Sequence, residues 1–237
     1  MKHIIALIVL LVSVLFSLNG NGQEIKTVLF PFRETVVSAR LESVLKPYKF
    51  RMGQPFKEGD ILAELDDSRY VIDLERTTAQ FQYAKNVFDE KKELRERKFT
   101  SDAELRKADY DFQLAKIALS EAKLNVSFCS IKAPFSGKIV EIMTHDFETT
   151  RPGQILCRII DDNRLLAIMN VPLTDTALTT IGTTVKIQLD QKDLTANGTV
   201  YEVSPQADHR TGTVRIRVLI DNPQGLFSAG MTGILQK

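Results

Sequence analysis

The sequence predicts a mostly β protein in which an α-helical coiled-coil hairpin interrupts one small β-domain and a small β-barrel follows. Three observations lead to this prediction. Residues 39–65 and 133–159 repeat one β-type pattern, a heptad pattern of apolar residues lies between the two copies, and alternating apolar residues fill the chain after Arg164.

The repeat aligns its two copies at a spacing of 94 residues, and each copy has short β-type runs punctuated by Gly and Pro. Since neither half can bury an apolar face alone, both are expected to form one small β-sandwich. One match fails, because Phe147 stands where the first copy has Gly53. The matched positions are Ala39 with Ala133, Leu45 with Ile139, Gly59 with Gly153, and Leu65 with Ile159.

The segment between the copies predicts two antiparallel helices with a turn near residues 99–101. Ser101 followed by Glu104 fits a capping box at the start of the second helix. Large and small residues alternate along both apolar seams, so antiparallel pairing is expected to set large against small. The large seam residues are Leu74, Phe81 and Phe88 on the first helix and Leu105, Phe112 and Leu119 on the second.

The last third of the sequence reads as four or five short strands. Apolar residues alternate strictly with polar ones at 183–189, further β-type runs lie at 165–171, 198–203 and 213–220, and turn residues separate the runs. Residues 174–179 are expected to form one short helix that ends before Gly182.

The N-terminus has the features of a secretory signal peptide. Lys2 and His3 precede the apolar run 4–18, and small residues surround Asn21, which places cleavage after Gly22. The alternative is an uncleaved anchor, because the run is slightly shorter than the ~18 residues of a membrane span. The mature chain is expected to be exported.

Composition argues against several classes of function. The 31 basic and 30 acidic residues give no basic face for nucleic acid. The three histidines have no metal-binding spacing, and Cys129 and Cys157 are read as small buried hydrophobes. No catalytic, cofactor-binding or metal-binding residue is therefore predicted, and no cofactor.

Two enzymatic functions are the alternatives. A swinging-cofactor carrier needs a lysine in the turn 66–69, where this chain has Arg69. A hydrolase would use a carboxylate pair, and the chain offers Asp66 with Asp67 and Asp161 with Asp162. Each pair ends a strand beside a polar turn, where Asp is common for local hydrogen bonding. We expect no enzymatic activity.

The order of these parts resembles the periplasmic adaptors, or membrane fusion proteins (HlyD-like), of resistance-nodulation-division (RND) efflux pumps. Residues 131–139, reading IKAPFSGKI, look like the second half of their split lipoyl-like (barrel-sandwich hybrid) domain. Residues 211–217, reading TGTVRIR, are similar to their β-barrel domain. The resemblance implies these parts: signal peptide 1–22, lipoyl-like domain 23–67 plus 128–162, hairpin 68–127, and β-barrel domain 163–237.

The sequence also departs from the family pattern. Ser43 replaces the glycine that is usual in the first half of the lipoyl-like domain. The family's membrane-proximal domain is expected to be absent, because about ten residues precede the first half and about six follow Met231. In the family pattern for channel contact, Leu94 and Ser101 match, but Glu90 stands where an arginine is expected.

The resemblance implies a non-enzymatic linker in a tripartite efflux complex. Its partners would be an inner-membrane RND transporter, an outer-membrane channel and further copies of itself in a ring. An adaptor of an ABC-type exporter or a type I secretion system is the alternative. The channel contact is expected at the hairpin tip, through Leu94, Phe99 and Ser101, with Ser101 serving as a helix cap, a contact or both.

Overall fold

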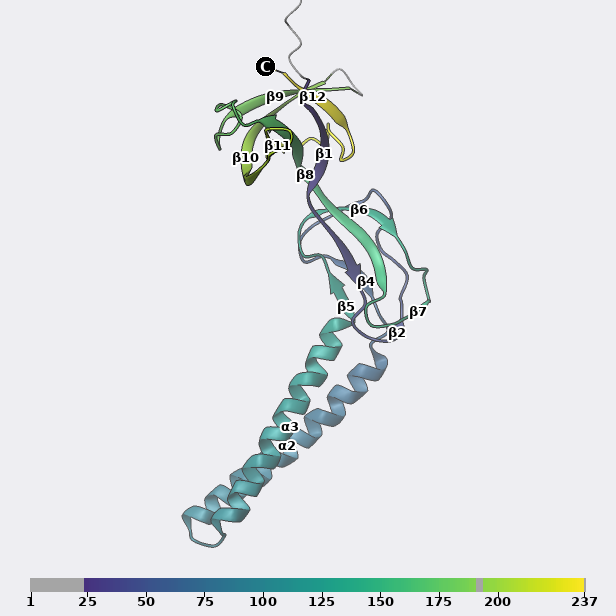
Figure 1. The fold of residues 1–237 in the computed structure, drawn as a ribbon. Helices are drawn as coiled ribbons and strands as arrows, with labels where there is room; N and C mark the ends of the chain where they lie inside the picture. Colours follow the sequence, from purple (N-terminus) through teal and green to yellow (C-terminus); the bar gives the residue numbers. More distant parts are fainter. Residues whose placement is uncertain (1–23, 191–193, 237) are drawn as a thin grey trace, which may run out of the picture. The chain divides into compact units, whose positions relative to one another are not determined.

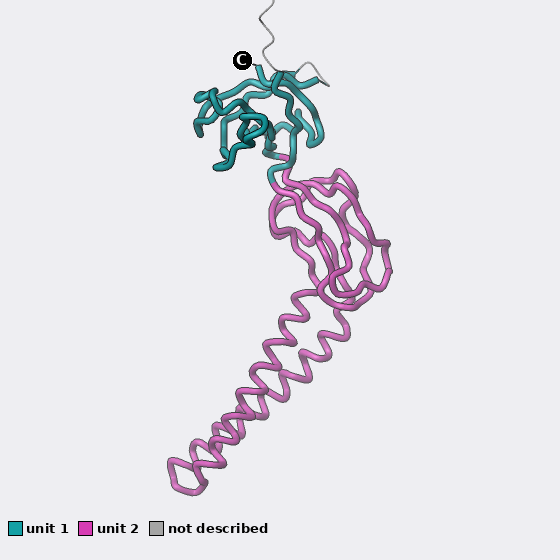
Figure 2. The backbone as a smooth tube through the Cα atoms, viewed as in Figure 1, with its two compact units in different colours: residues 1–32, 163–237 teal, residues 33–162 magenta. Residues whose placement is uncertain are grey.

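The computed structural model describes residues 24–190 and 194–236. Two compact units are present, coloured separately in Figure 2: unit 1 contains residues 1–32 and 163–237, and unit 2 contains residues 33–162. The chain passes between them twice, within strands β1 (Lys26–Ser38) and β8 (Ile155–Pro172). Mostly β structure, a helical hairpin and a barrel are all present, as the sequence predicts.

Unit 1 is the β-barrel. Its antiparallel strands follow the order β1–β12–β9–β10–β11–β8, and the hydroxyl of Thr27 in β1 donates to the carbonyl of Ile168 in β8 at 3.0 Å. Along β11 the side chains of Val214, Ile216, Val218 and Ile220 are buried and alternate with polar neighbours. This period of two fills the barrel core. The remaining strands are β9 (Thr184–Leu189), β10 (Leu194–Asp208), β11 (Thr213–Asp221) and β12 (Thr232–Gln236).

Two sequence expectations differ from unit 1 as observed. Residues 174–179 form turns and no helix. The carboxylate of Asp175 accepts the N–H of Leu178 as a helix cap would, and the N–H of Thr179 donates to the carbonyl of Asp175 at 3.2 Å, but the segment ends after this single turn. Residues 26–32 were assigned to the lipoyl-like part, yet Leu29 is fully buried in the barrel core. The alternation of buried and exposed residues in β1 breaks at residues 31–34, but the strand itself continues from one unit into the other.

The β-part of unit 2 consists of the two repeat halves, and equivalent backbone hydrogen bonds join each half to the other. Ala39 N–H donates to Gln154 and Gly153 N–H to Ala39; 94 residues on, Ala133 N–H donates to Asp60 and Gly59 N–H to Ala133. Both glycines have φ of +86°. The sandwich predicted from the repeat is therefore a pair of interlocked halves. Its strands are β2 (Ser43–Val44), β3 (Pro55–Phe56), β4 (Ile61–Glu64), β5 (Ser130–Lys132), β6 (Gly137–Ile142) and β7 (Thr149–Thr150).

The hairpin of unit 2 consists of α2 (Ser68–Glu96) and α3 (Asp102–Phe128), which lie side by side (Figure 1). Cys129 follows α3 and is buried in a different apolar cluster from Cys157, and both thiols are free. No helix in the described part of the chain has both the length and the apolar character that crossing a membrane requires. The expected signal segment 1–22 lies outside the described residues.

Candidate docking site at the hairpin tip

The tip of the hairpin begins where α2 ends in a Schellman motif. The N–H of Phe99 donates to the carbonyl of Leu94 at 2.8 Å, and the N–H of Lys98 donates to that of Arg95 at 2.9 Å. These two bonds satisfy carbonyls that the end of a helix leaves unpaired. Lys98 occupies the left-handed position of the motif, with φ of 62°, where glycine is the usual residue. The turn is therefore fixed by its backbone at a local cost in strain.

The second half of the tip is a complete capping box. The N–H of Glu104 donates to the hydroxyl of Ser101 at 3.2 Å, and the N–H of Ser101 donates to the carboxylate of Glu104 at 3.1 Å. The hydroxyl of Thr100 donates to the same carboxylate. This hydroxyl and then the Ser101 N–H hold the pKa of Glu104 below its usual value. The cap predicted from Ser101 and Glu104 is present as a motif.

A charged pair joins the two helices across the turn. The guanidinium of Arg95 donates to the carboxylate of Asp102, and this bond lowers the pKa of Asp102 and raises that of Arg95. Sequence reasoning missed this pair, and it also missed the left-handed Lys98. Neither has a sequence signal, since the two charges lie in different helices and the left-handed residue is not a glycine.

The three tip residues named from the sequence lie in different environments. Phe99 is 78% exposed, although its own backbone N–H is bound within the turn. Leu94 is half-buried on α2, and Ser101 is exposed with its hydroxyl engaged in the cap. The tip therefore presents one aromatic ring to solvent on a backbone that hydrogen bonds hold in place.

The seam behind the tip brings the predicted residues together but in a different register. Phe112 packs against both Phe81 and Phe88, with ring centroids 5.5 Å apart in each pair, and its ring stacks on Phe88 at 7°. The expectation of large against small is wrong at this layer, because Phe112 inserts between two large residues of α2. Leu119 is buried, and Leu74 and Leu105 are half-buried.

The four carboxylates of the two candidate hydrolytic pairs each have a local partner. Asp66 accepts the N–H and hydroxyl of Ser68, and Asp67 pairs with Lys46 at 3.0 Å. Asp161 pairs with Arg33 at 2.8 Å, and Asp162 pairs with Lys138 at 2.7 Å. The described residues include no group of three or more His, Cys, Asp or Glu that could hold a metal.

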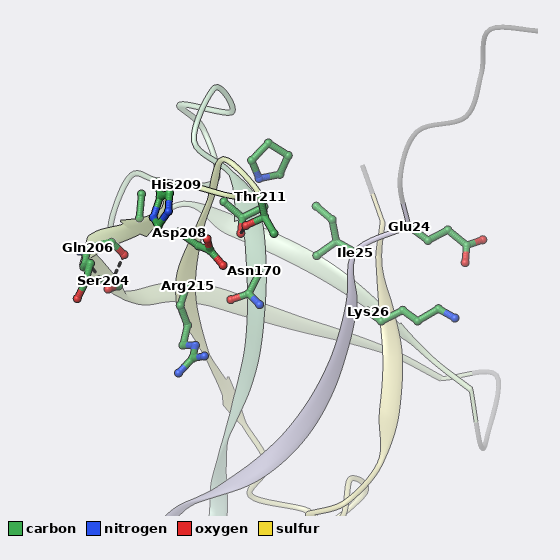
Figure 3. Close-up of a pocket in the computed structure, with 13 residues that line it drawn as sticks. Glu24, Ile25, Lys26, Asn170, Ser204, Gln206, Asp208, His209, Thr211 and Arg215 are labelled. Atoms are coloured by element: carbon green, nitrogen blue, oxygen red, sulfur yellow. Dashed lines mark hydrogen bonds between the residues drawn. The ribbon is translucent and has the colours of Figure 1, made fainter.

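Unit 1 has a hollow of about 640 Å³ with a mainly polar lining (Figure 3). Asn170, Asp208, His209 and Arg215 line it, and the N–H of Gln206 donates to the hydroxyl of Ser204 at its edge. Its lining has neither a large apolar surface nor a cluster of metal ligands. It is a weaker candidate for docking than the tip.

Known proteins resemble this chain in both fold and sequence. The family described as CusB-like, β-barrel domain matches residues 167–236, which lie in unit 1. The nodulation protein NolF of Rhizobium meliloti is 25% identical over 90% of this chain, and the efflux pump periplasmic linker BepD of Brucella suis is 27% identical over 81%. The chain is related to the RND-type periplasmic adaptors.

The length of the match limits what the relatives imply. The chain spans 62% of NolF and 56% of BepD. A solved MacA–MexA chimera with the α-hairpin of Pseudomonas aeruginosa MexA is 17% identical, covers 90% of this chain and is itself 79% covered, with a TM-score of 0.76. That likeness shows a shared fold.

Proposed function

We propose that the chain is a periplasmic adaptor that links an inner-membrane RND transporter to an outer-membrane channel. The observation that carries the proposal is the hairpin tip, where the exposed Phe99 is held on a turn fixed by a Schellman motif and a capping box. The relationship to BepD, whose name describes a periplasmic linker, supports it. The work of such a protein is mechanical: it makes no covalent bond and transfers no proton.

The length of the hairpin suits a reach toward a distant partner. Helices of 29 and 27 residues extend about 40 Å at 1.5 Å per residue. Along this length the seam holds the helices together, so a push or pull at the tip is transmitted to the β-part of unit 2. An exposed aromatic ring at the end of such a lever is suited to insertion between helices of a partner.

The class of transporter follows from unit 1. Its barrel matches an RND-type domain family, which favours an RND transporter over an ABC-type exporter or a type I secretion system. In this proposal, unit 1, which combines the residues up to 32 with residues 163–237, is the barrel domain that contacts the transporter, and residues 33–67 with 128–162 form the lipoyl-like domain. Copurification of the tagged chain with its inner-membrane partner identifies the class directly.

Export is part of the same proposal. Residues 1–22 would act as a signal peptide, so the mature chain would begin at Gln23 in the periplasm. N-terminal sequencing of the protein from a periplasmic fraction checks this. An intact Met1 in the membrane fraction would mean that the segment is an anchor.

The tip is tested with Phe99→Asp and Leu94→Asp, which place a charge where an apolar contact is proposed. Met52→Asp is the matched control, because Met52 is 72% exposed in the β-part of unit 2. We expect both tip variants to lose copurification of the outer-membrane channel and efflux in cells. The control should keep both activities, and circular dichroism should show equal helix content in all variants.

Ser101→Ala separates capping from contact. If Ser101 acts through its cap, the change costs about 1 kcal/mol of helix stability and leaves channel binding in place. Loss of channel binding without loss of stability would give Ser101 a direct contact. Channel binding that survives both Phe99→Asp and Leu94→Asp would refute docking through the tip.

A further inference from the structure

A groove of about 490 Å³ lies in the β-part of unit 2, near the point where α3 leads into β5 (Figure 1). One of its walls is the end of β1, and the other is β5. In the described sheets β5 pairs with β4, and β1 pairs with β12 and β8, so the groove separates two strands that do not bond to each other. Its volume lies within the roughly 300–1,000 Å³ that is usual for small-molecule sites.

The alternation of the two strands determines which side chains face the groove. Val37 on β1 is buried in the core of the β-part, and Ile131 on β5 packs against the same core. Because successive side chains of a strand point to opposite sides, the neighbours of these two residues point outward, into the groove. These outward residues are Val36 and Ser38 on β1, and Ser130 and Lys132 on β5.

The charge of the groove is entirely positive. Arg40 and Lys132 line it and are exposed, and none of the described lining residues is acidic. The guanidinium of Arg40 lies over the ring of Phe128, 4.7 Å from its centroid, which holds the charge against an apolar surface and leaves N–H donors for another group. Within the described part of the chain neither cation makes a salt bridge. Two positive charges are therefore uncompensated at one small site.

The rest of the lining combines apolar surface with hydroxyl groups. Val36 is 48% exposed, and Phe128 is half-buried. The hydroxyl of Ser127 donates to a carbonyl of its own helix at 2.6 Å, whereas those of Ser38 and Ser130 make no hydrogen bond to another described residue. The groove therefore offers an apolar strip beside hydrogen-bond donors and positive charge.

The hollow of unit 1 differs from this groove in its charge. Lys26 and Arg215 line that hollow, but so do Glu24 and Asp208. Mixed charges give the hollow no preference for one sign of ligand. The groove of unit 2 attracts anions and repels cations, so its charge is selective.

We propose that the groove binds a small amphiphilic anion, a molecule with an apolar body and one carboxylate, sulfonate or phosphate group. The apolar body lies along Val36 and Phe128, and the anionic group accepts hydrogen bonds from Arg40 and Lys132. This inference rests on the proposed adaptor function and deepens it, because it names a class of molecule that the adaptor binds during export.

The binding test is isothermal titration calorimetry of the full mature chain with three probes below their micelle concentrations. Dodecanoate represents flexible, lipid-derived acids, naphthalenesulfonate represents rigid compounds from outside the cell, and dodecyltrimethylammonium has the dodecyl chain with the opposite charge. We expect saturable binding of at least one anion, about tenfold or more tighter than that of the cation. The anion that binds indicates the source. Equal binding of the cation, or no saturable binding of either anion, would overturn the proposal.

A charge reversal tests the two cations. The variant is Arg40→Glu with Lys132→Glu, and the matched control is Arg51→Glu with Lys57→Glu, two exposed residues of the β-part that line neither groove nor hollow. We expect the groove variant to lose about tenfold or more in anion affinity. The control should stay within about twofold, since distant exposed charges are screened by salt. Equal losses would mean attraction to the whole surface and would refute the site.

A cysteine footprint locates the ligand without changing the charge. In Val36→Cys the new thiol lies in the groove, and in Met52→Cys it lies on an exposed turn of the same β-part. The native Cys129 and Cys157 are buried. We expect the anion that binds to slow maleimide labelling of Val36→Cys several-fold and to leave Met52→Cys unchanged. Labelling that is equally fast with and without ligand would place binding elsewhere. Slow labelling without ligand that speeds up on dilution would mean that a second copy covers the groove, and either result overturns the proposal.

Failure of this inference is distinguishable from failure of the adaptor function, because binding is measured on the isolated chain and docking by copurification of the channel. Absent binding with intact channel copurification would remove the groove as a ligand site and leave the adaptor function in place. Saturable, charge-dependent binding without channel copurification would support the groove while the docking of the tip is wrong.

Discussion

The two halves of the β-part of unit 2 have the same backbone contacts but differ in side chains where the contacts are closest. In the second half a Cβ on Gly137 would stand 1.9 Å from the carbonyl oxygen of Ile160. In the first half the equivalent residue is Ser43, and its hydroxyl donates to the equivalent carbonyl, that of Asp66, at 2.6 Å. At Gly137 the two backbones are therefore in direct contact, whereas at Ser43 a side-chain hydroxyl bridges the equivalent gap.

A second difference lies at a turn, and here the first half has the glycine. The turn at Gly53 has φ of 80°, and the equivalent turn at Phe147 has φ of 65°. Both residues donate N–H bonds of 2.8–2.9 Å to the opposite half, Gly53 to Ile139 and Phe147 to Leu45. These hydrogen bonds between the halves therefore require a left-handed residue at this turn in each half. Only the first half meets that demand with glycine, so the repeat is symmetric in backbone and asymmetric in strain.

The largest predicted effect follows from Gly137. Gly137→Ala should cost about 3 kcal/mol of unfolding free energy, because the new Cβ meets backbone atoms of β8 that cannot rotate away. Ser43→Ala is the matched change in the other half and should cost about 1 kcal/mol, the value of one hydrogen bond. Urea unfolding measures both. Equal costs would mean that the two halves are closed in the same way.

The next effect is at Gly53. A Cβ there meets nothing within 4 Å, so Gly53→Ala tests backbone conformation alone. We expect a loss of about 1–2 kcal/mol, because an L side chain resists positive φ. The measurement is again urea unfolding, with Gly53→Asn as a milder comparison since asparagine tolerates this region. A neutral Gly53→Ala would show that the turn relaxes when the glycine is lost.

Much of the fold was predictable from the sequence because it depends on periodicity. The repeat identified Ala39 and Ala133 as equivalent positions, and the two make equivalent backbone hydrogen bonds. The heptads placed Phe112 and Leu119 on the inner side of the hairpin. The register between the helices was not predictable. It depends on the length and geometry of the turn, which include a left-handed lysine at position 98.

The candidate site was predictable in part for the same reason. The capping box has a local sequence signature, so Ser101 and Glu104 were found. The Arg95–Asp102 pair depends on how two helices meet, which no local pattern encodes. Residues 26–32 were not separated from the lipoyl-like part because one continuous strand, β1, belongs to both units.

A gain in stability is predicted where the second half is strained. Phe147 is 70% exposed, so Phe147→Gly removes little packing and relieves the backbone. We expect a gain of up to about 1 kcal/mol, reduced by the greater freedom that glycine gives the unfolded chain. Thermal unfolding checks the sign. A clear loss of stability would mean that the ring of Phe147 contributes packing that its exposure hides.

The smallest predicted effect is on the pH dependence of stability, and it distinguishes the turn of the second half from that of the first. Gln54 accepts the N–H of Arg51 at 2.7 Å, and the equivalent Glu148 accepts the N–H of His145 at 3.0 Å. That backbone bond, followed by the side chain of Gln154, lowers the pKa of Glu148. A carboxylate with a lowered pKa stabilises the fold above its unfolded pKa, about 4.3, and loses that contribution as pH falls through the folded pKa.

The amide of Gln54 does not titrate, so the first half should keep its turn through the same range of pH. Glu148→Gln makes the second half resemble the first and should flatten the dependence of stability on pH below about 4.3 relative to the wild type. Because Glu148 is at the surface, the change is expected to be small, and urea midpoints at pH 3.5 and pH 6 must be compared in both proteins. A variant whose midpoint falls as much as that of the wild type would locate the acid sensitivity elsewhere, for example at Glu104, whose pKa is also lowered.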